Sequence, residues 1–316
     1  MGAALTLAER GRGRTAPNPC VGCVIVKDGR IVGRGWTQPG GRPHAEAMAL
    51  AAAGEAARGA TVYTTLEPCA HESPRGPACS DLLVAAGVAE VVIALGDPDP
   101  RTDGRGAERL RGSGIGVTTG VMKAEAWRSM AGFLTRRALG RPHVTLKLAT
   151  SLDGCIARTD GESKWITGPE ARAHAHLERA RHEAILVGGG TAKADVPKLD
   201  VRLEGLEQHS PRRLLLTRHR GDQEHFDHVD SPAAIAGLEG VDHLLVEGGA
   251  GAAAAFLAED LVDRLLLYRA PILIGGGKPA LDDIGLTHLA DAHGRWRLHD
   301  SRMLGIDRME IYERVR

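Results

Sequence analysis

The first half of the chain alternates short apolar runs with longer helical runs, and this pattern predicts an α/β fold. The apolar runs expected to form strands lie at residues 21–26, 30–36, 61–66, 88–95 and 115–119. The runs expected to form helices lie at residues 44–53, 81–86 and 125–139. Asp28-Gly29 joins the first two strands and is typical of a type I′ hairpin turn. Such alternation predicts a sheet with helices on both faces.

A break at Gly140-Arg141-Pro142 ends the last of these helices. Glycine suits a helix C-terminus, and the residue before a proline avoids helical geometry. A chain of 316 residues is long for one hydrophobic core. We therefore expect two domains, at residues 1–140 and 141–316.

The second half restarts with an apolar run and contains several glycine clusters. Strands are predicted at residues 143–150, 184–187, 243–246 and 265–274, and the last three run into glycines. Thr167-Gly168-Pro169-Glu170 is typical of a capping box and predicts a helix that extends to about residue 181. Residues 222–231 are polar and rich in histidine, which predicts a surface loop.

Composition favours a small-molecule substrate in a reducing compartment. The chain has 40 basic and 40 acidic residues, zero formal net charge and 3% aromatic residues, whereas polynucleotide binders usually carry a basic face and stacking rings. No apolar run suits a signal peptide or a membrane span, so we expect a cytoplasmic protein with no membrane or nucleic-acid partner. The five cysteines are then expected to be metal ligands or core residues.

One group of residues has the chemistry of a zinc-dependent deaminase. His44, Cys69 and Cys79 offer one imidazole and two thiolates, which leave a fourth zinc position open for water. Bound zinc lowers the pKa of that water to about 7. Glu46 is expected to move the proton from water to the ring and the departing amine. The order H-x-E then P-C is that of nucleobase deaminases, although nine residues, rather than two, separate the cysteines.

Other interpretations of the same residues stay open. Cys20 and Cys23 could complete a structural four-thiolate site with Cys69 and Cys79, but this leaves the His44 motif unexplained. Cys23 lies in an apolar run, where cysteine is usually a core residue, and the same role is expected for Cys155. The chain could also be a nucleic-acid deaminase with an accessory domain, or a zinc-stabilised binding module without activity.

Four segments of the first half resemble the bifunctional deaminase/reductase family of riboflavin biosynthesis. They are Thr-Ala-Pro-Asn-Pro at 15–19, Val-Gly-Cys-Val-Ile-Val at 21–26, Pro-His-Ala-Glu at 43–46 and Thr-Leu-Glu-Pro-Cys at 65–69. The resemblance implies a cytidine-deaminase-like α/β/α sandwich with zinc, in which Asn18 holds the pyrimidine. The segment 71–78 departs from the family, and Asp99 stands where the family usually has asparagine. His71 and Arg75 are candidates to contact the substrate phosphate, or are solvent-facing loop residues.

The second half resembles the reductase half of the same family. The segments that carry the resemblance are residues 147–154, 161–167, 188–191 and 247–249. They imply a dihydrofolate-reductase-like α/β domain that uses NADPH. Carried over by position, the expected NADPH contacts are Ala149, Trp165, Thr191, Asp195, Gly249, Ala250, Gly251, Ala252, Ala253, Ala254 and Ala255. The expected substrate contacts are Lys147, Ser163, Arg179, Leu199, Arg202 and Glu247.

Each of the basic residues has a second interpretation. Arg179 and Arg202 suit a phosphate, because an arginine fork matches its oxygens, but either could instead form a surface ion pair. Lys147 could position or protonate the sugar, or could be an ordinary lysine near the end of a strand.

The resemblance implies two consecutive steps of riboflavin synthesis and a small-molecule partner. The first half would replace the 2-amino group of 2,5-diamino-6-ribosylamino-4(3H)-pyrimidinone 5′-phosphate with oxygen. The second half would reduce the ribosyl group to a ribityl chain with NADPH. The family commonly forms dimers or tetramers, so we expect a homo-oligomer.

Overall fold

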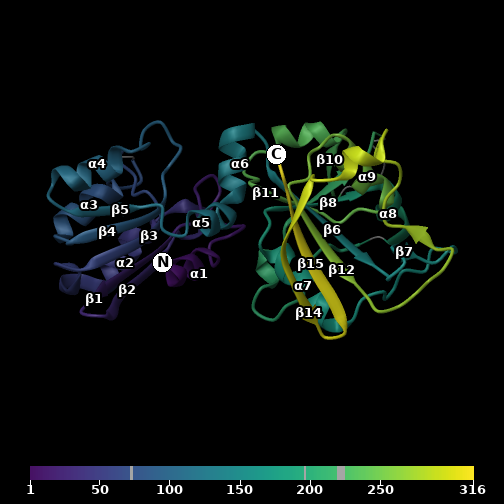
Figure 1. Cartoon of the computed structure of the whole chain (residues 1–316), viewed down its shortest axis with the longest axis horizontal. Coiled ribbons are helices and arrows are strands. Elements are labelled where there is room, and N and C mark those ends of the chain that lie inside the picture. The colour runs from purple at the N-terminus through teal and green to yellow at the C-terminus, as the bar shows by residue number, and fades with distance from the viewer. Residues whose placement is uncertain (72–73, 196, 219–224) are drawn as a thin grey trace. The chain divides into compact units, whose positions relative to one another are not determined.

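The computed structural model describes residues 1–71, 74–195, 197–218 and 225–316, apart from the side chains of residues 194 and 195. The chain divides into two compact units, Met1–Leu139 and Gly140–Arg316 (Figure 1). Gly140 has a φ of 68°, a left-handed conformation that glycine adopts readily and that ends the preceding helix. The division lies one residue from the break that the sequence predicts.

The first unit is built on a five-stranded sheet with the order β2-β1-β3-β4-β5. Its strands are β1 (Gly22–Lys27), β2 (Arg30–Trp36), β3 (Thr61–Leu66), β4 (Glu90–Leu95) and β5 (Gly116–Thr119). β1 runs antiparallel to β2 and β3, whereas β3, β4 and β5 are parallel. The turn between β1 and β2 has positive φ at Asp28 (49°) and Gly29 (71°), as a type I′ hairpin requires.

Among the described residues of this unit, six α-helices accompany the sheet. They are α1 (Gly2–Ala8), α2 (Ala45–Ala53), α3 (Cys79–Ala86), α4 (Arg105–Gly112), α5 (Lys123–Ser129) and α6 (Ala131–Leu139). α1 contacts α5, whereas α2 contacts α3 and α3 contacts α4. Val24 of β1 packs with Leu7 of α1, and its neighbour Ile25 shares a core with Ala49 of α2. Alternate residues of β1 therefore serve two helix layers, one on each face of the sheet.

Two glycines of β2 allow α2 to approach the sheet closely. A Cβ atom at Gly35 would lie 2.2 Å from the carbonyl oxygen of Ala45, and one at Gly33 would lie 2.3 Å from that of Ala49. A side chain at either position would push the helix away. These glycines therefore fix the height of α2, whose second residue is Glu46.

Sequence-based prediction misses some helices of the first unit. The predicted helix 125–139 is two helices, α5 and α6, which are separated at the fully buried Met130. α3 begins at Cys79, two residues before the predicted start. The sequence analysis predicts neither α1 nor α4. α4 includes Gly106 and Gly112 among polar residues, so its apolar face is too short to be recognised.

The second unit is built on an eight-stranded sheet with the order β10-β9-β8-β11-β6-β12-β15-β14. Its strands are β6 (His143–Thr150), β8 (Ala184–Gly188), β9 (Arg212–Leu216), β10 (Asp227–Val229), β11 (His243–Val246), β12 (Arg264–Arg269), β14 (Trp296–Leu304) and β15 (Asp307–Arg314). The pairs from β10 to β12 are parallel, and β15 and β14 add antiparallel pairs. β7 (Cys155–Ala157) and β13 (Lys278–Pro279) form a separate two-stranded sheet.

Helices α7 (Pro169–Ala180), α8 (Gly189–Asp195) and α9 (Ala250–Ala258) accompany the larger sheet. All four residues of β11 are buried, and they contribute to cores on both of its faces. This fits a parallel strand that is covered on both faces. Across the described ranges, the helices lack the length and apolar character needed to cross a bilayer.

Several predictions for the second unit are wrong in detail. β12 ends at Arg269, before the predicted limit of 274, and β14 and β15 were not predicted. Residues 227–229 of the predicted loop 222–231 form β10, whereas residues 222–224 lie outside the described residues. The predicted capping box is not formed, because Gly168 is the N-cap of α7 and lacks a capping side chain. Its backbone N–H donates to the Asp307 carboxylate instead, at 2.6 Å.

Candidate active sites

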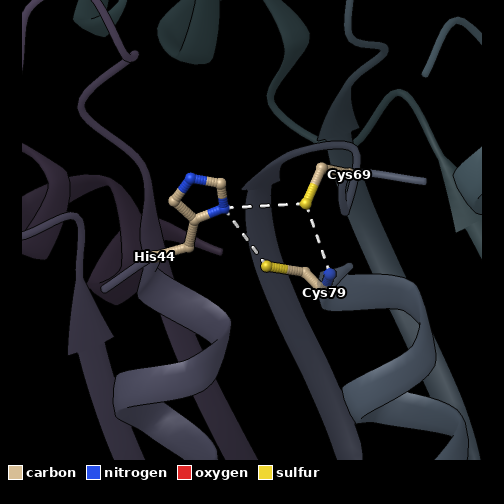
Figure 2. A group of neighbouring side chains, drawn as sticks. All are labelled: His44, Cys69 and Cys79. Atoms are coloured by element: carbon tan, nitrogen blue, oxygen red, sulfur yellow. Dashed lines mark hydrogen bonds between the residues drawn. The ribbon is translucent and has the colours of Figure 1, made fainter. Parts of the chain in front are cut away.

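Three side chains of the first unit form a compact group of metal ligands. One ligand atom from each of His44, Cys69 and Cys79 lies within 4.8 Å of the others. His44 Nδ1 is 3.3 Å from Cys79 Sγ and 3.6 Å from Cys69 Sγ (Figure 2). One nitrogen and two sulfur donors suit zinc, and three protein ligands are typical of a catalytic zinc site. The residues present therefore fit the zinc ion that the sequence predicts.

Two of the three predicted ligands lie where helices begin, and the third follows a strand. His44 is the N-cap of α2, Cys79 is the first residue of α3, and Cys69 follows the end of β3. The backbone N–H of Cys79 donates to Cys69 Sγ at 3.2 Å. Hydrogen bonding from the Cys79 thiol lowers the pKa of Cys69, and the same contact raises the pKa of Cys79. Cys69 is thus the more readily ionised of the two thiols, and metal binding would release the thiol protons that remain.

Glu46 lies beside this group and is buried, with 3% of its surface exposed. Desolvation raises the pKa of its carboxyl group, and the nearby charge of His44 opposes that rise. Its Oε1 accepts a hydrogen bond from Thr64 Oγ1 at 3.1 Å. Glu46, His44 and Cys69 line the same pocket. A carboxyl group next to a predicted metal site, with a raised pKa, is suited to accept and release protons.

Asn18 also lines this pocket. Its Nδ2 donates to the carbonyl oxygen of Gly41 at 2.8 Å and lies 3.3 Å from His44 Nε2. Gly41 has a φ of 85°, and a Cβ atom there would lie 2.7 Å from the Asn18 amide. The glycine therefore leaves room for the amide beside the imidazole.

Glu67, for which the sequence predicts no role, holds the loop after β4 against the turn that carries Cys69. Its buried carboxylate accepts backbone N–H groups of Asp97 at 3.3 Å, Gly104 at 3.1 Å and Ala107 at 3.0 Å. A Cβ atom at Gly106 would lie only 2.0 Å from the carbonyl oxygen of Pro68. These contacts explain why glutamate precedes Pro68-Cys69 and why glycine stands at position 106.

The same pocket has several charged lining residues. They include Arg42, His71, Arg75, Asp97, Asp99, Arg101 and Arg137. Asp99 accepts hydrogen bonds from Arg101 Nη2 at 2.6 Å and from Arg137 Nη2 at 3.2 Å. Hydrogen bonding from Arg101 lowers the pKa of Asp99, whereas burial raises that of Asp97 to about 6. Of the loop between the cysteines, residues 72 and 73 lie outside the described residues.

In the second unit, three of the predicted substrate contacts form a partly buried ion cluster. Arg179 makes a two-pronged contact with Glu247, with Nε–Oε1 at 2.7 Å and Nη2–Oε2 at 2.9 Å. Lys147 Nζ is 3.6 Å from Glu247 Oε2. Burial opposes the ionisation of Glu247, but the charges of Lys147 and Arg179 outweigh it and lower the pKa to about 2. Arg179 is thus already engaged by a carboxylate.

The loop that carries Leu199 and Arg202 is attached to this cluster. Arg179 Nη1 donates to the carbonyl oxygen of Asp200 at 3.0 Å, and His176 Nδ1 lies 3.1 Å from the same oxygen. Leu199 is buried and has a φ of 53°, which is rare for leucine. The Arg202 side chain is 58% exposed and pairs with Asp200 at 3.4 Å. Sequence reasoning did not identify His176.

Two helices begin next to each other at the carboxyl ends of β8 and β11, where the sequence predicts the cofactor phosphates. Gly249, the N-cap of α9, donates its N–H to Thr191 Oγ1 of α8 at 3.1 Å. The free backbone N–H groups of a helix N-terminus suit a phosphate, so the residues present fit a dinucleotide. Ala252, Ala253 and Ala254 are buried. Of the predicted NADPH-binding segment 249–255, the start of α9 is therefore the part that a cofactor can reach.

The remaining predicted contacts are more scattered. Ala149 is half-buried on β6, and Ser163 is half-buried in the segment before α7. Trp165 is 64% exposed, and the guanidinium of Arg172 lies 4.7 Å from the centre of its ring. The side chain of Asp195 lies outside the described residues.

Comparison with known proteins gives consistent matches for both units. Residues 1–95 match the cytidine and deoxycytidylate deaminase zinc-binding region, and residues 142–307 match the RibD C-terminal domain. The riboflavin biosynthesis protein RibD of Escherichia coli K12 is 41% identical over 97% of this chain and 96% of its own length. RibD of Mycobacterium tuberculosis is 39% identical over 97% of this chain and 94% of its own length.

Solved structures agree with these matches. Acinetobacter baumannii RibD has a TM-score of 0.86 and 36% identity, covering 100% of this chain and 98% of its own. A diaminohydroxyphosphoribosylaminopyrimidine deaminase/5-amino-6-(5-phosphoribosylamino)uracil reductase from Thermotoga maritima has a TM-score of 0.88 and 32% identity, covering 100% and 97%. The first unit is thus a cytidine-deaminase-like domain and the second a dihydrofolate-reductase-like domain. This chain belongs to the bifunctional riboflavin-biosynthesis family, whose members join a zinc-dependent deaminase to an NADPH-dependent reductase.

Proposed function

We propose that the first unit removes the 2-amino group of 2,5-diamino-6-ribosylamino-4(3H)-pyrimidinone 5′-phosphate and that the second unit reduces the product. The observation that carries this proposal is the group of His44, Cys69 and Cys79 beside the buried carboxyl of Glu46. This is the donor set of a catalytic zinc site together with a proton carrier that is not a ligand.

In the first unit, His44, Cys69 and Cys79 would hold zinc, which supplies the Lewis acidity that makes water ionisable near neutral pH. Glu46 would take a proton from the attacking water and deliver protons to the ring nitrogen and the departing amine. Water then supplies the oxygen of the new carbonyl, and ammonia leaves. The raised pKa of Glu46 supports this role, because an acid–base group works best when its pKa approaches the working pH.

Arginine side chains of the pocket support a contact with the phosphate of the substrate, although the lining also includes four carboxylates, Glu46, Glu67, Asp97 and Asp99. Arg42, Arg75, Arg101 and Arg137 line the pocket, together with His71. The Arg101 and Arg137 side chains are 62% and 46% exposed, which suits the solvent-facing end of a substrate. Asn18 would hold the pyrimidine, since an amide offers both a donor and an acceptor.

In the second unit, NADPH would supply hydride to C1′ of the ribosyl group. Gly249, Ala250 and Gly251 at the start of α9 would bind a cofactor phosphate, with Thr191 fixing the first of them. Lys147 would approach the sugar, and Glu247 and Arg179 would fix the lysine and the loop to Arg202. The Arg202 side chain is 58% exposed and pairs with the half-buried carboxylate of Asp200 at 3.4 Å, which leaves part of its guanidinium accessible and supports a phosphate contact.

We also propose that the chain acts on this small molecule as a cytoplasmic homo-oligomer and binds no nucleic acid or membrane. The zero formal net charge supports the absence of a nucleic-acid partner. The oligomer rests on the family resemblance alone, and light scattering of the purified protein measures it directly.

The test of the proposed function is the Glu46→Gln variant of the full chain. Glutamine keeps the size of the side chain but cannot carry the proton, so ammonia release should fall by about 100-fold or more. Zinc content and NADPH oxidation with the deaminated substrate should stay at wild-type levels. Loss of both activities in a folded variant would contradict separate sites, and full ammonia release would contradict the role of Glu46.

A further inference from the structure

The carboxyl group of Glu46 has a buried hydroxyl neighbour that the proposed mechanism does not use. Thr64 lies on β3, is fully buried, and faces Cys23 on β1. Its Oγ1 donates to Glu46 Oε1 at 3.1 Å and to the carbonyl oxygen of Leu66 at 3.0 Å. One side-chain oxygen thus joins the end of β3 to the predicted proton carrier on α2.

This contact limits the movement of the carboxyl group. A hydroxyl has one hydrogen, so its two acceptors share it. The Leu66 carbonyl fixes the hydroxyl to the backbone of β3, two residues along the strand. Glu46 then meets a donor at a fixed position, and rotation about its terminal bond breaks the contact. The carboxyl group that this contact holds lines the pocket together with His44 and Cys69.

We propose that Thr64 is a positioning residue for deamination, and that its hydroxyl holds the Glu46 carboxyl in the orientation needed for proton transfer. This proposal rests on the proposed role of Glu46. Positioning matters because a displacement of about 1 Å can cost about 100-fold in rate. A positioning role for Thr64 differs from a structural one in its effect: loss of the hydroxyl should lower kcat and leave zinc binding and substrate affinity unchanged.

The neighbouring residue provides a matched control. Thr65 is also fully buried on β3, but its Oγ1 accepts the backbone N–H of Gly22 at 3.1 Å. Thr65→Val removes the same atom from the same strand without removing a contact to Glu46. Thr64→Val is equally conservative in shape. Any difference between the two variants in turnover therefore reports the contact to Glu46.

The experiment compares Thr64→Val, Thr64→Ser and Thr65→Val in the full chain, with Glu46→Gln as reference. The measurements are zinc content, melting temperature, and kcat and KM for ammonia release. Thr64→Val should lower kcat by about 10- to 100-fold while zinc content is kept. KM should change by less than about two-fold, as expected when an interaction acts only in the transition state. Thr64→Ser, which keeps the hydroxyl, should restore most of the lost kcat, and Thr65→Val should retain wild-type kcat.

Equal kcat values for Thr64→Val and Thr65→Val would overturn the proposal. A loss of kcat in Thr64→Val that only follows a loss of zinc would overturn it too, because the role would then be structural. If Thr64→Val does not fold, Thr64→Ser and Thr64→Ala give the same comparison with smaller side chains. Full ammonia release by Glu46→Gln would overturn the proposed function and this role with it. If Glu46→Gln loses ammonia release but Thr64→Val keeps wild-type kcat, only the proposed role of Thr64 is overturned.

Discussion

At the scale of single residues, both sites depend on ionisable groups whose charge is set by their neighbours. The clearest case is Glu247, which is largely covered, lies beside Lys147 and Arg179, and has a pKa lowered to about 2 from an ordinary 4.5. Removing one member of a buried ion pair leaves an uncompensated charge. The ion cluster is therefore a source of pH-dependent stability as well as a candidate substrate site.

Glu247→Gln should reduce stability most at neutral pH. Because the folded pKa is lowered, the stabilisation is complete above the unfolded pKa and is lost as the pH falls toward 2. A shift from 4.5 to about 2 corresponds to about 3 kcal/mol. Denaturant unfolding of both proteins at pH 7 and pH 3 should show a difference in unfolding free energy that narrows at the lower pH. Glu204→Gln, at an exposed position, is the control, and a difference that stays constant with pH would contradict this account.

The sequence predicted the metal-ligand residues because ligand chemistry restricts which residue types can serve. His44, Cys69 and Cys79 then came together in the structure as a compact group. The partners of Arg179 were not predictable in the same way. Arg179 and Glu247 are 68 residues apart in the sequence. Neither segment indicates whether the guanidinium of Arg179 pairs with a carboxylate or binds a phosphate. Such pairings depend on tertiary contacts that one sequence does not encode in its local pattern.

At the scale of elements, close backbone contacts hold the helices that carry or support the first site. α4 touches the turn before Cys69 at Gly106, whose missing side chain leaves space for the carbonyl oxygen of Pro68. Glu67 fixes the same helix through its backbone N–H groups. The position of Cys69, a predicted zinc ligand, is thus linked to a helix that contributes none of the predicted ligands.

Gly106→Ala should displace the turn that carries Cys69. The new Cβ atom would lie 2.0 Å from the Pro68 oxygen, so the backbone must shift, at a cost of about 1–3 kcal/mol. Zinc content and ammonia release should fall together, while NADPH oxidation persists. Gly112→Ala in the same helix is the matched control, because no atom lies within 4 Å of its added Cβ. If both variants retain full zinc content, the proposed link between α4 and the ligand turn is wrong.

Helices and strands were predicted correctly from the sequence where turn residues or apolar runs form a strong local pattern. The hairpin at Asp28-Gly29 and the strand β3 were predicted with correct bounds or nearly so, because turn chemistry and apolar runs are local signals. β14 was missed because both of its faces are largely exposed, so it lacks an alternating apolar pattern. α4 was missed for a similar reason, since its buried residues are mostly small.

At the scale of the whole molecule, each unit has its own sheet, core and candidate site. The predicted zinc ligands, Glu46 and their pocket belong to Met1–Leu139, whereas the ion cluster and the start of α9 belong to Gly140–Arg316. The two reactions should therefore respond separately to changes within one unit. The resemblance of the chain to RibD proteins over nearly its full length agrees with this two-part organisation.

The most direct test of the account is to remove zinc from the full protein with a chelator and assay both reactions before and after zinc is restored. The account predicts that ammonia release is lost with the metal and returns with it, while NADPH oxidation with the deaminated substrate continues. Ammonia release that persists without zinc would contradict the role of His44, Cys69 and Cys79. Loss of both reactions in protein that remains folded would contradict the assignment of separate sites to the two units.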